Sequence, residues 1–160
     1  MVRNNVVLDN RILDEINELK RAYEDVHSCL LPTLYILQRE HGWLSPEVLE
    51  SAASVLNIPV ATVKGISTFY TMFNHKPMGR HLIQLCTNVS CMIMGGETLL
   101  DILKSRYGLE PNLTTPDGRF SLVIMECIGA CDKAPAMLID TDLHGNLTQE
   151  SIIEILEKYN

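Results

Sequence analysis

Two cysteine pairs are the residues whose type and spacing best fit a chemical task in this 160-residue sequence. Four residues separate Cys86 from Cys91, and three separate Cys127 from Cys131. Each pair directly follows a short apolar run that is typical of a buried strand. If the two strands are neighbours and end at the same edge of a sheet, four sulfur atoms converge on one site. This arrangement suits a [2Fe-2S] cluster, in which each iron takes two cysteine sulfurs beside two bridging sulfides.

Spacing alone leaves other uses of four cysteines open. A structural zinc site also takes four thiolates, although it favours pairs separated by two residues. Two disulfides are chemically possible, but the sequence begins without a secretion signal, and cytosolic thiols stay reduced. A thioredoxin-type pair, with two residues between the cysteines, does not occur in the sequence. A Rieske-type cluster needs two histidine ligands, and the five histidines, which we expect on the surface or in loops, show no paired spacing.

Small residues beside the cysteines suit the same chemistry. Gly129 and Ala130 leave backbone N–H groups close to the second pair, where hydrogen bonds to sulfur stabilise an added electron. Gly95 and Gly96 follow the first pair, either as further N–H donors or as ordinary loop residues. Cys29 lies among apolar residues of a predicted helix, so we expect it to be a buried free thiol.

Charge and hydropathy argue against several classes of function. The chain holds 13 Lys and Arg against 20 Asp and Glu, a formal net charge of −7, and such a surface repels nucleic acid and anionic lipid. The longest run without a charged residue, 81–96, is shorter than the roughly 20 apolar residues of a membrane span. We therefore expect a cytoplasmic protein without nucleic-acid partners or direct membrane insertion. No hydrolase elbow or nucleotide-binding loop occurs, and no catalytic acid, base or nucleophile stands out.

The elements of the first half are predicted to be helices. Apolar residues recur every three or four positions over 12–23 and 28–40, followed by Gly42 as a stop signal. Ser45 and Pro46 are typical of the N-cap and first residue of a third helix, which runs to about residue 56, and a fourth follows over 60–68. The run 69–73 and Trp43 fit either the core or a docking surface. Residues 1–78 should form a small helical bundle.

The second half, residues 79–160, mixes strands and helices. Short apolar runs predict strands at 81–85, 120–125 and 136–139, and helical spacing marks 97–107 and 149–159. This order indicates an α/β fold with a sheet covered by helices. The half that carries the four cysteines is also the more acidic one, with 6 basic and 11 acidic residues against 7 and 9 in the first half. Since reduction adds negative charge, we expect an acidic domain to lower the potential of a cluster.

Four segments in order resemble a known family. Residues 38–46, 63–73, 76–86 and 126–135 are similar to the small iron–sulfur subunit of the NADH-oxidising module of respiratory complex I. The resemblance runs from about residue 10 to the C-terminus. It implies a helical domain followed by a thioredoxin-like domain that carries one [2Fe-2S] cluster. The ligands that it implies are Cys86, Cys91, Cys127 and Cys131.

The resemblance also implies partners and a location. Family members pair tightly with a larger flavoprotein subunit that binds NADH and FMN, and they join other subunits of the peripheral arm. This chain would then lie on the cytoplasmic side of the bacterial inner membrane through the complex and would hold no complete active site itself. One departure is visible, because Val89 and Ser90 stand where relatives commonly have Thr-Pro.

Three alternative functions follow from the residues. An equivalent subunit of a soluble NAD-linked hydrogenase or formate dehydrogenase would carry the same motifs. The rhythm of residues 45–66 also resembles a helix-turn-helix of an iron–sulfur regulator, but Lys64 is the one basic residue of its second helix, where several phosphate contacts are needed. A free ferredoxin-like electron carrier is the third alternative.

Overall fold

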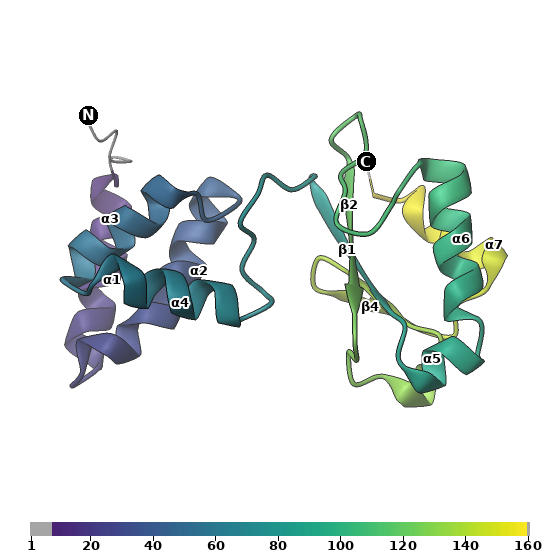
Figure 1. The fold of residues 1–160 in the computed structure, drawn as a ribbon, viewed down its shortest axis with the longest axis horizontal. Helices are drawn as coiled ribbons and strands as arrows, with labels where there is room; N and C mark the ends of the chain where they lie inside the picture. The colour runs from purple at the N-terminus through teal and green to yellow at the C-terminus, as the bar shows by residue number, and fades with distance from the viewer. Residues whose placement is uncertain (1–7, 160) are drawn as a thin grey trace. The chain divides into compact units, whose positions relative to one another are not determined.

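The computed structural model describes residues 8–159 of the chain. The protein divides into two compact units, and the boundary lies between Pro77 and Met78. The first unit is built of helices, and the second combines a sheet with helices (Figure 1). The division expected from the sequence falls one residue later, after position 78.

The helical unit contains the four predicted α-helices and a short 3-10 helix. Ser45 caps the third helix through a hydrogen bond of 3.3 Å from the Val48 N–H, as its N-cap position predicts. Gly42 ends the second helix with φ of 77°, a conformation that glycine adopts without steric cost. The second helix starts two residues later than expected, because residues 26–29 form the 3-10 turn. In order, the elements are α1 (Asn10–Ala22), η1 (Val26–Cys29), α2 (Leu30–His41), α3 (Pro46–Leu56) and α4 (Val60–Phe69).

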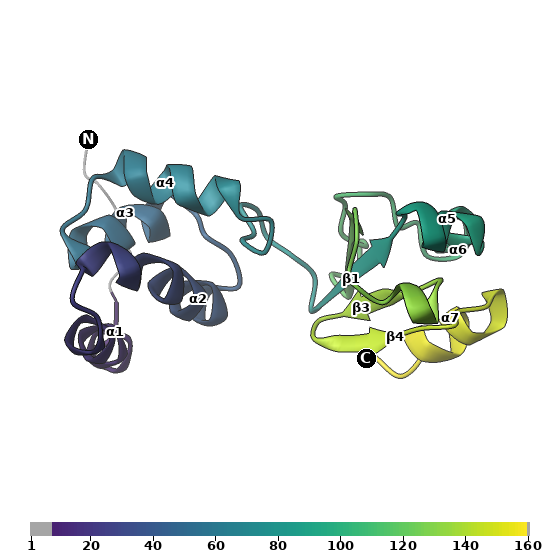
Figure 2. The same ribbon diagram turned by 90° about the horizontal axis from the view of Figure 1, so that it is seen from below.

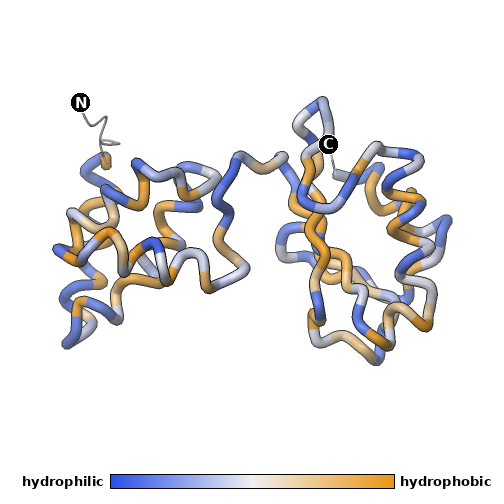
Figure 3. Tube along the Cα trace, viewed as in Figure 1, coloured by the Kyte–Doolittle hydropathy of each residue, from blue (hydrophilic) through white to orange (hydrophobic). Residues whose placement is uncertain are grey.

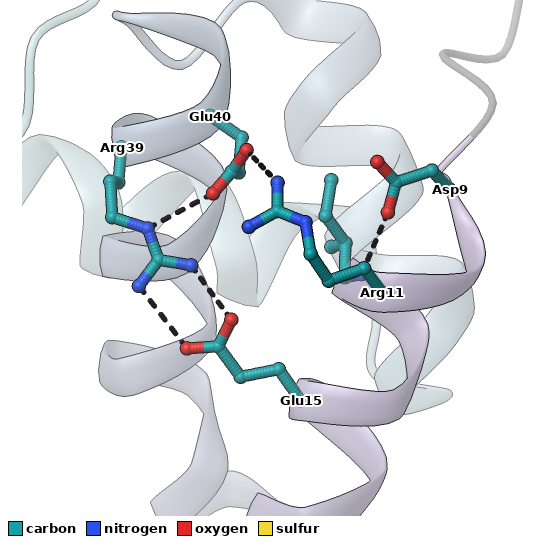
Figure 4. Close-up of polar contacts among 6 residues, drawn as sticks. Asp9, Arg11, Glu15, Arg39 and Glu40 are labelled. Carbon is teal, nitrogen blue, oxygen red and sulfur yellow. Dashed lines mark hydrogen bonds and ion pairs between the residues drawn. The ribbon is translucent and has the colours of Figure 1, made fainter.

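Charged side chains join α1 to α2 on the surface of this unit (Figure 4). Arg39 of α2 donates two hydrogen bonds to the carboxylate of Glu15 on α1, at 3.2 and 2.7 Å. Arg39 also donates to Glu40 at 3.0 Å, and Glu40 accepts a hydrogen bond from Arg11 of α1. The apolar faces of the two helices bury Ile16 and Leu37 in a shared core.

The second unit is a four-stranded sheet in the order β2-β1-β3-β4. Its central strand β1 pairs with β2 in parallel and with β3 in antiparallel orientation, and β3 pairs antiparallel with β4. The predicted strands and helices are all present. The bounds are β1 (His81–Cys86), α5 (Val89–Ile93), α6 (Gly96–Tyr107), β2 (Phe120–Met125), η2 (Cys131–Lys133), β3 (Met137–Ile139), β4 (Asp142–His144) and α7 (Gln149–Leu156).

One face of the sheet is covered by α6 and α7, which pack on the same side (Figure 2). Alternate residues of β1, Ile83 and Leu85, are fully buried in one core with Leu103 of α6 and Ile152 of α7. Most residues of β1 and β2 are hydrophobic (Figure 3). The α/β class predicted from the order of elements is therefore confirmed. No helix within residues 8–159 has the length and apolar character needed to cross a membrane.

Two short elements were not expected from the sequence. The strand β4 and the helix α5 have no counterpart among the strands and helices predicted for this half. Each has only three to five residues, so neither spans enough positions to show a hydrophobic period. Pairing with β3 and capping by Asn88 stabilise them instead.

The C-terminal end of the chain is tied to the sheet by polar contacts. Arg119 donates hydrogen bonds to the carbonyl oxygens of Leu156 and Tyr159, at 2.6 and 2.5 Å. The Tyr159 hydroxyl donates to Asp142 at 2.9 Å and lies 2.9 Å from Nε2 of His144. These contacts hold the end of α7 against β2 and β4.

Candidate iron–sulfur site

The two cysteine pairs follow two strands that are direct neighbours. Strands β1 and β2 run parallel, with Cys86 in register with Met125, so both strands end at the same edge of the sheet. Cys86 is the last residue of β1, and Cys127 lies two residues beyond the end of β2. The condition that we set from the sequence, neighbouring strands with a common edge, is met by the parallel arrangement.

The first pair is buried, and a short helix that the sequence did not predict holds its second cysteine. Cys91 lies inside α5, which begins after Asn88, whose side-chain oxygen accepts a hydrogen bond of 2.7 Å from the Val89 N–H. The helix turns Cys91 inward, where it packs with Cys86, Ala130 and Ala136 in a small cluster. The other side of α5 and the residue after it are apolar and exposed: Val89, Met92, Ile93 and Met94.

Gly96 permits this packing. A Cβ at position 96 would lie 2.9 Å from the carbonyl oxygen of Cys91 and 3.3 Å from that of Cys86. Glycine is therefore required by the close approach of α6 to the backbone of the first pair. The Gly95 N–H donates to the carbonyl of Met92 at 3.1 Å, so that hydrogen bond supports the backbone turn and not a sulfur atom.

The second pair is exposed: Cys127 lies in the loop after β2, and Cys131 is the first residue of the 3-10 helix η2. The Cys86 thiol donates to the carbonyl oxygen of Glu126 at 3.8 Å, which links the two cysteine segments. The Gly129 N–H donates to Sγ of Cys127 at 3.4 Å, as the small residue at this position predicts. Gly129 has φ of 76°, so a side chain there would be strained. Cys127 and Cys131 are both exposed.

Residues of both cysteine pairs affect the pKa of Cys91. Burial raises the pKa of Cys91, and the neighbouring Cys86 and Cys131 raise it further, while a hydrogen bond from the backbone of Ala136 acts in the opposite direction. Because Cys131 belongs to the second pair, this effect connects both pairs. The sequence predicted Ala136 only as the first residue of a strand, and it gave no sign of the contact with Cys91.

The donor set fits a [2Fe-2S] cluster. All five cysteines are free thiols, and four of them flank one edge of the sheet, two buried and two exposed. Among residues 8–159, no three Cys, His, Asp or Glu side chains are gathered closely enough to hold a single metal ion. Four thiolates from two chain segments match the donor set of a binuclear cluster, which asks for two sulfurs at each of two irons.

The remaining candidate residues lie elsewhere. Cys29 is fully buried in the core of the helical unit, as expected of a structural free thiol. Not all histidines are surface or loop residues, which corrects the expectation from their spacing. His81 and His144 lie in strands and are half-buried, and His81 Nδ1 contacts Asp140 at 2.8 Å.

Comparison with protein families shows to which family the chain belongs. The family model of the thioredoxin-like [2Fe-2S] ferredoxins matches residues 16–160. The chain belongs to this family. Membership confirms the predicted fold class and the predicted cofactor, one [2Fe-2S] cluster.

Curated relatives are named as one kind of subunit of a single enzyme, NADH-quinone oxidoreductase. The chain is 43% identical over 146 residues to such a subunit from Rhizobium meliloti, covering 91% of this chain and 87% of the relative. It is 41% identical to the corresponding protein of Escherichia coli K12, covering 86% and 82%. The corresponding protein of Pseudomonas aeruginosa is 34% identical over 99% of both chains. These relatives confirm the family resemblance inferred from the four motifs.

A solved structure of similar fold comes from another redox enzyme. An NAD+-reducing [NiFe]-hydrogenase in the air-oxidized state matches with a TM-score of 0.69 and 25% identity, over 79% of this chain. The match spans 22% of the hydrogenase chain, which is therefore much longer.

Proposed function

We propose that this chain is the [2Fe-2S] electron-transfer subunit of a respiratory NADH:quinone oxidoreductase, complex I. The observation that carries the proposal is the common edge of β1 and β2, which brings both cysteine pairs of a thioredoxin-like [2Fe-2S] ferredoxin together. The identity of 34–43% to curated subunits of NADH-quinone oxidoreductases supports the choice of complex. As a subunit, the chain would exert its oxidoreductase role within the assembly.

The proposed ligands are Cys86, Cys91, Cys127 and Cys131. When bound, the cluster accepts and returns one electron at a time. The buried pair excludes water from one side of the site, and the Gly129 N–H stabilises negative charge on the sulfur of Cys127. The net charge of −5 on residues 79–160, 6 basic against 11 acidic, opposes a further negative charge, which favours a low reduction potential.

The proposed partner is the NADH- and FMN-binding flavoprotein subunit. The exposed side of α5 supports this, because Ile93 is 72% exposed and Met92 and Met94 lie beside it at the edge that carries the cysteines. Such a contiguous apolar surface is typical of an interaction site. Through this partner and others of the peripheral arm, the chain would be held at the cytoplasmic side of the bacterial inner membrane.

The similarity to the NAD+-reducing hydrogenase favours one second candidate. A soluble NAD-linked hydrogenase or formate dehydrogenase could use the same kind of subunit, and the TM-score of 0.69 supports a shared fold. The alternative of an iron–sulfur helix-turn-helix regulator is less well supported. Its DNA-contacting helix would be α4, where Lys64 is the one basic residue and several phosphate contacts are needed. Purification of the tagged chain under conditions that preserve native complexes distinguishes the candidates. Copurifying NADH:quinone-reductase activity supports complex I, whereas copurifying nickel supports a hydrogenase.

Electron paramagnetic resonance of the dithionite-reduced protein, with iron and sulfide analysis, tests the cluster. We expect two irons and two sulfides per chain and a [2Fe-2S] signal. Cys86→Ala and Cys131→Ala should abolish the signal. Cys29→Ala is the matched control, because it removes a buried thiol of the other unit, and should keep the signal. Stoichiometric zinc in anaerobically prepared protein would refute the assignment.

A further inference from the structure

Cys131 begins a short segment whose backbone is fixed by its own hydrogen bonds. It is the first residue of the 3-10 helix η2, in which the Lys133 N–H donates to the carbonyl oxygen of Ala130 at 3.0 Å. The Ala134 N–H donates to the carbonyl oxygen of Cys131 itself at 3.4 Å. A displacement of Lys133 is therefore transmitted to Cys131, which lies two residues earlier in the same helical turn.

The turn between β4 and α7, residues 145–147, holds this segment from the outside. The Asn146 N–H donates to the carbonyl oxygen of Lys133 at 2.6 Å. The Leu147 N–H donates to the carbonyl oxygen of Pro135 at 3.1 Å. The Leu147 side chain is buried in the core between the sheet and its helices. Two backbone hydrogen bonds thus join the segment of Cys131 to the core of the second unit.

Gly145 allows the turn to approach the segment closely. A Cβ at position 145 would lie 2.5 Å from Cβ of Lys133 and 2.9 Å from the carbonyl oxygen of the same residue. Neither atom belongs to the flexible end of a side chain, so neither can rotate away. A larger residue at position 145 must therefore push the turn and η2 apart. Gly145 has the same relation to the second cysteine pair that Gly96 has to the first.

The other side of the segment is joined to the first cysteine pair. The Cys86 N–H, at the end of β1, donates to the carbonyl oxygen of Ala136 at 3.2 Å. Cys86 and Cys91 lie with Ala136 in one small cluster of buried residues. The segment from Cys131 to Ala136 is therefore held between the end of β1 and the turn 145–147.

We propose that the turn 145–147 is a positioning element of the iron–sulfur site and sets where Cys131 lies relative to Cys86. The proposal rests on the proposed ligands. Two cysteine pairs must match the fixed spacing of two irons, so the segments that carry them need firm support. The turn contains no ligand and acts through the backbone of Lys133 and Pro135.

Gly145→Val tests this role in the full-length, cluster-loaded chain. The variant should change the g values of the dithionite-reduced cluster in electron paramagnetic resonance, because Cys131 moves. It should also speed the loss of iron to a chelator by about tenfold or more, the usual effect of altering the groups that support metal ligands. Both measurements are made well below the Tm of the variant.

Gly79→Val is the matched control. A Cβ at position 79 would lie 2.8 Å from the carbonyl carbon of Phe120, so the crowding is similar. Phe120 is the first residue of β2, whereas Cys127 follows the other end of that strand. Neither Gly79 nor Gly145 has a positive φ, so a side chain is crowded at both positions without backbone strain. Gly79→Val should lower Tm but keep the wild-type g values.

Asn146 offers an independent test through the backbone alone. Its side chain is exposed, and its φ of 51° is a left-handed conformation that β-branched residues rarely adopt. Asn146→Gly keeps the N–H and permits this φ, so it should keep the wild-type spectrum. Asn146→Val strains the turn that donates to Lys133 and should change the g values.

The outcomes separate this proposal from the proposed function. A wild-type chain without a [2Fe-2S] signal would refute both. If the wild type shows the signal and Gly145→Val lowers Tm but keeps the g values and the rate of iron loss, the turn is a structural element only, and the positioning role alone is refuted. Equal spectral changes in Gly79→Val and Gly145→Val would also refute it, because they would follow from lower stability in general. Should Gly145→Val not fold, the comparison of Asn146→Val with Asn146→Gly decides.

Discussion

Cys86 and Met125 are register partners at the ends of two parallel strands. Because parallel strands end on the same side of a sheet, the segments that follow them begin next to each other. Cys127 follows Met125 by two residues, and the Cys86 thiol reaches the carbonyl of Glu126 between them. The position of both cysteine pairs is therefore a consequence of strand order.

Gly96→Ala should disturb the proposed cluster site without removing a ligand. The added Cβ would lie 2.9 Å from the carbonyl of Cys91, so either α5 or α6 must move. Overpacking of this kind costs about 1–3 kcal/mol. Thermal denaturation should show lower stability, and iron analysis should show less cluster per chain.

Gly65→Ala is the control for that substitution. Nothing lies within 4 Å of a Cβ at position 65, in the middle of an exposed helix face. Alanine there should raise stability by about 0.5–1 kcal/mol through helix propensity. The iron content should stay at the wild-type value. Equal iron loss in both variants would contradict the role assigned to Gly96.

Because of Tyr159, we expect the fold to lose stability at high pH. Burial, Asp142 and Asp140 raise its pKa to about 12, from 10.0 for a free tyrosine. Since the folded pKa lies above the unfolded one, the neutral hydroxyl stabilises the fold fully below pH 10, and this contribution disappears as the pH rises toward 12. Tyr159→Phe should lose about 1 kcal/mol at neutral pH with the hydrogen bond to Asp142.

Denaturant unfolding from pH 8 to pH 12 checks this prediction. The difference in stability between wild type and Tyr159→Phe should shrink through the upper part of that range. Tyr23→Phe, at an exposed site of the helical unit, should follow the wild-type curve. A constant difference across the range would show that the hydroxyl does not titrate in the folded protein as described.

The ion pairs between α1 and α2 should make a small, salt-sensitive contribution to stability. The hydrogen bonds from Arg39 lower the pKa of Glu15, so this stabilisation is present above the ordinary carboxyl pKa and is lost as the pH falls. Arg39→Gln should lower Tm slightly at low salt and less at 1 M NaCl, since exposed ion pairs are weak and screened. Arg21→Gln serves as the control, and melting curves at two salt concentrations measure the effect.

Gln38 should control the turn that presents Met72. Gln38→Glu keeps the oxygen that accepts from Asn74 but replaces the donor to the Met72 carbonyl with a second acceptor. Stability should fall by about 0.5–1.5 kcal/mol, the usual net effect of losing one hydrogen bond, because water can replace the donor at this exposed carbonyl.

Local signals explain why the helical unit was largely predictable. Ser45, Gly42 and the apolar spacing of each helix act within one or two turns, so their effect can be inferred from neighbouring residues. Local signals could not show which aromatic residues of the run 69–73 lie in the core and which are exposed. Phe73 is core and Phe69 is exposed, because the turn after α4 rotates one ring inward and leaves the other outside.

By itself, the sequence determined the four thiols, the strands before them and the family to which the chain belongs, because residue type and spacing are local properties. Only the tertiary structure decided that β1 and β2 are parallel neighbours, that α5 holds Cys91 and that β4 extends the sheet. These depend on pairing between distant segments, such as β1 with β2, whose energy comes from hydrogen bonds and burial shared between them. The need for glycine at position 96 likewise became visible only in the tertiary structure, because backbone atoms of Cys86 and Cys91 leave no room there for a Cβ.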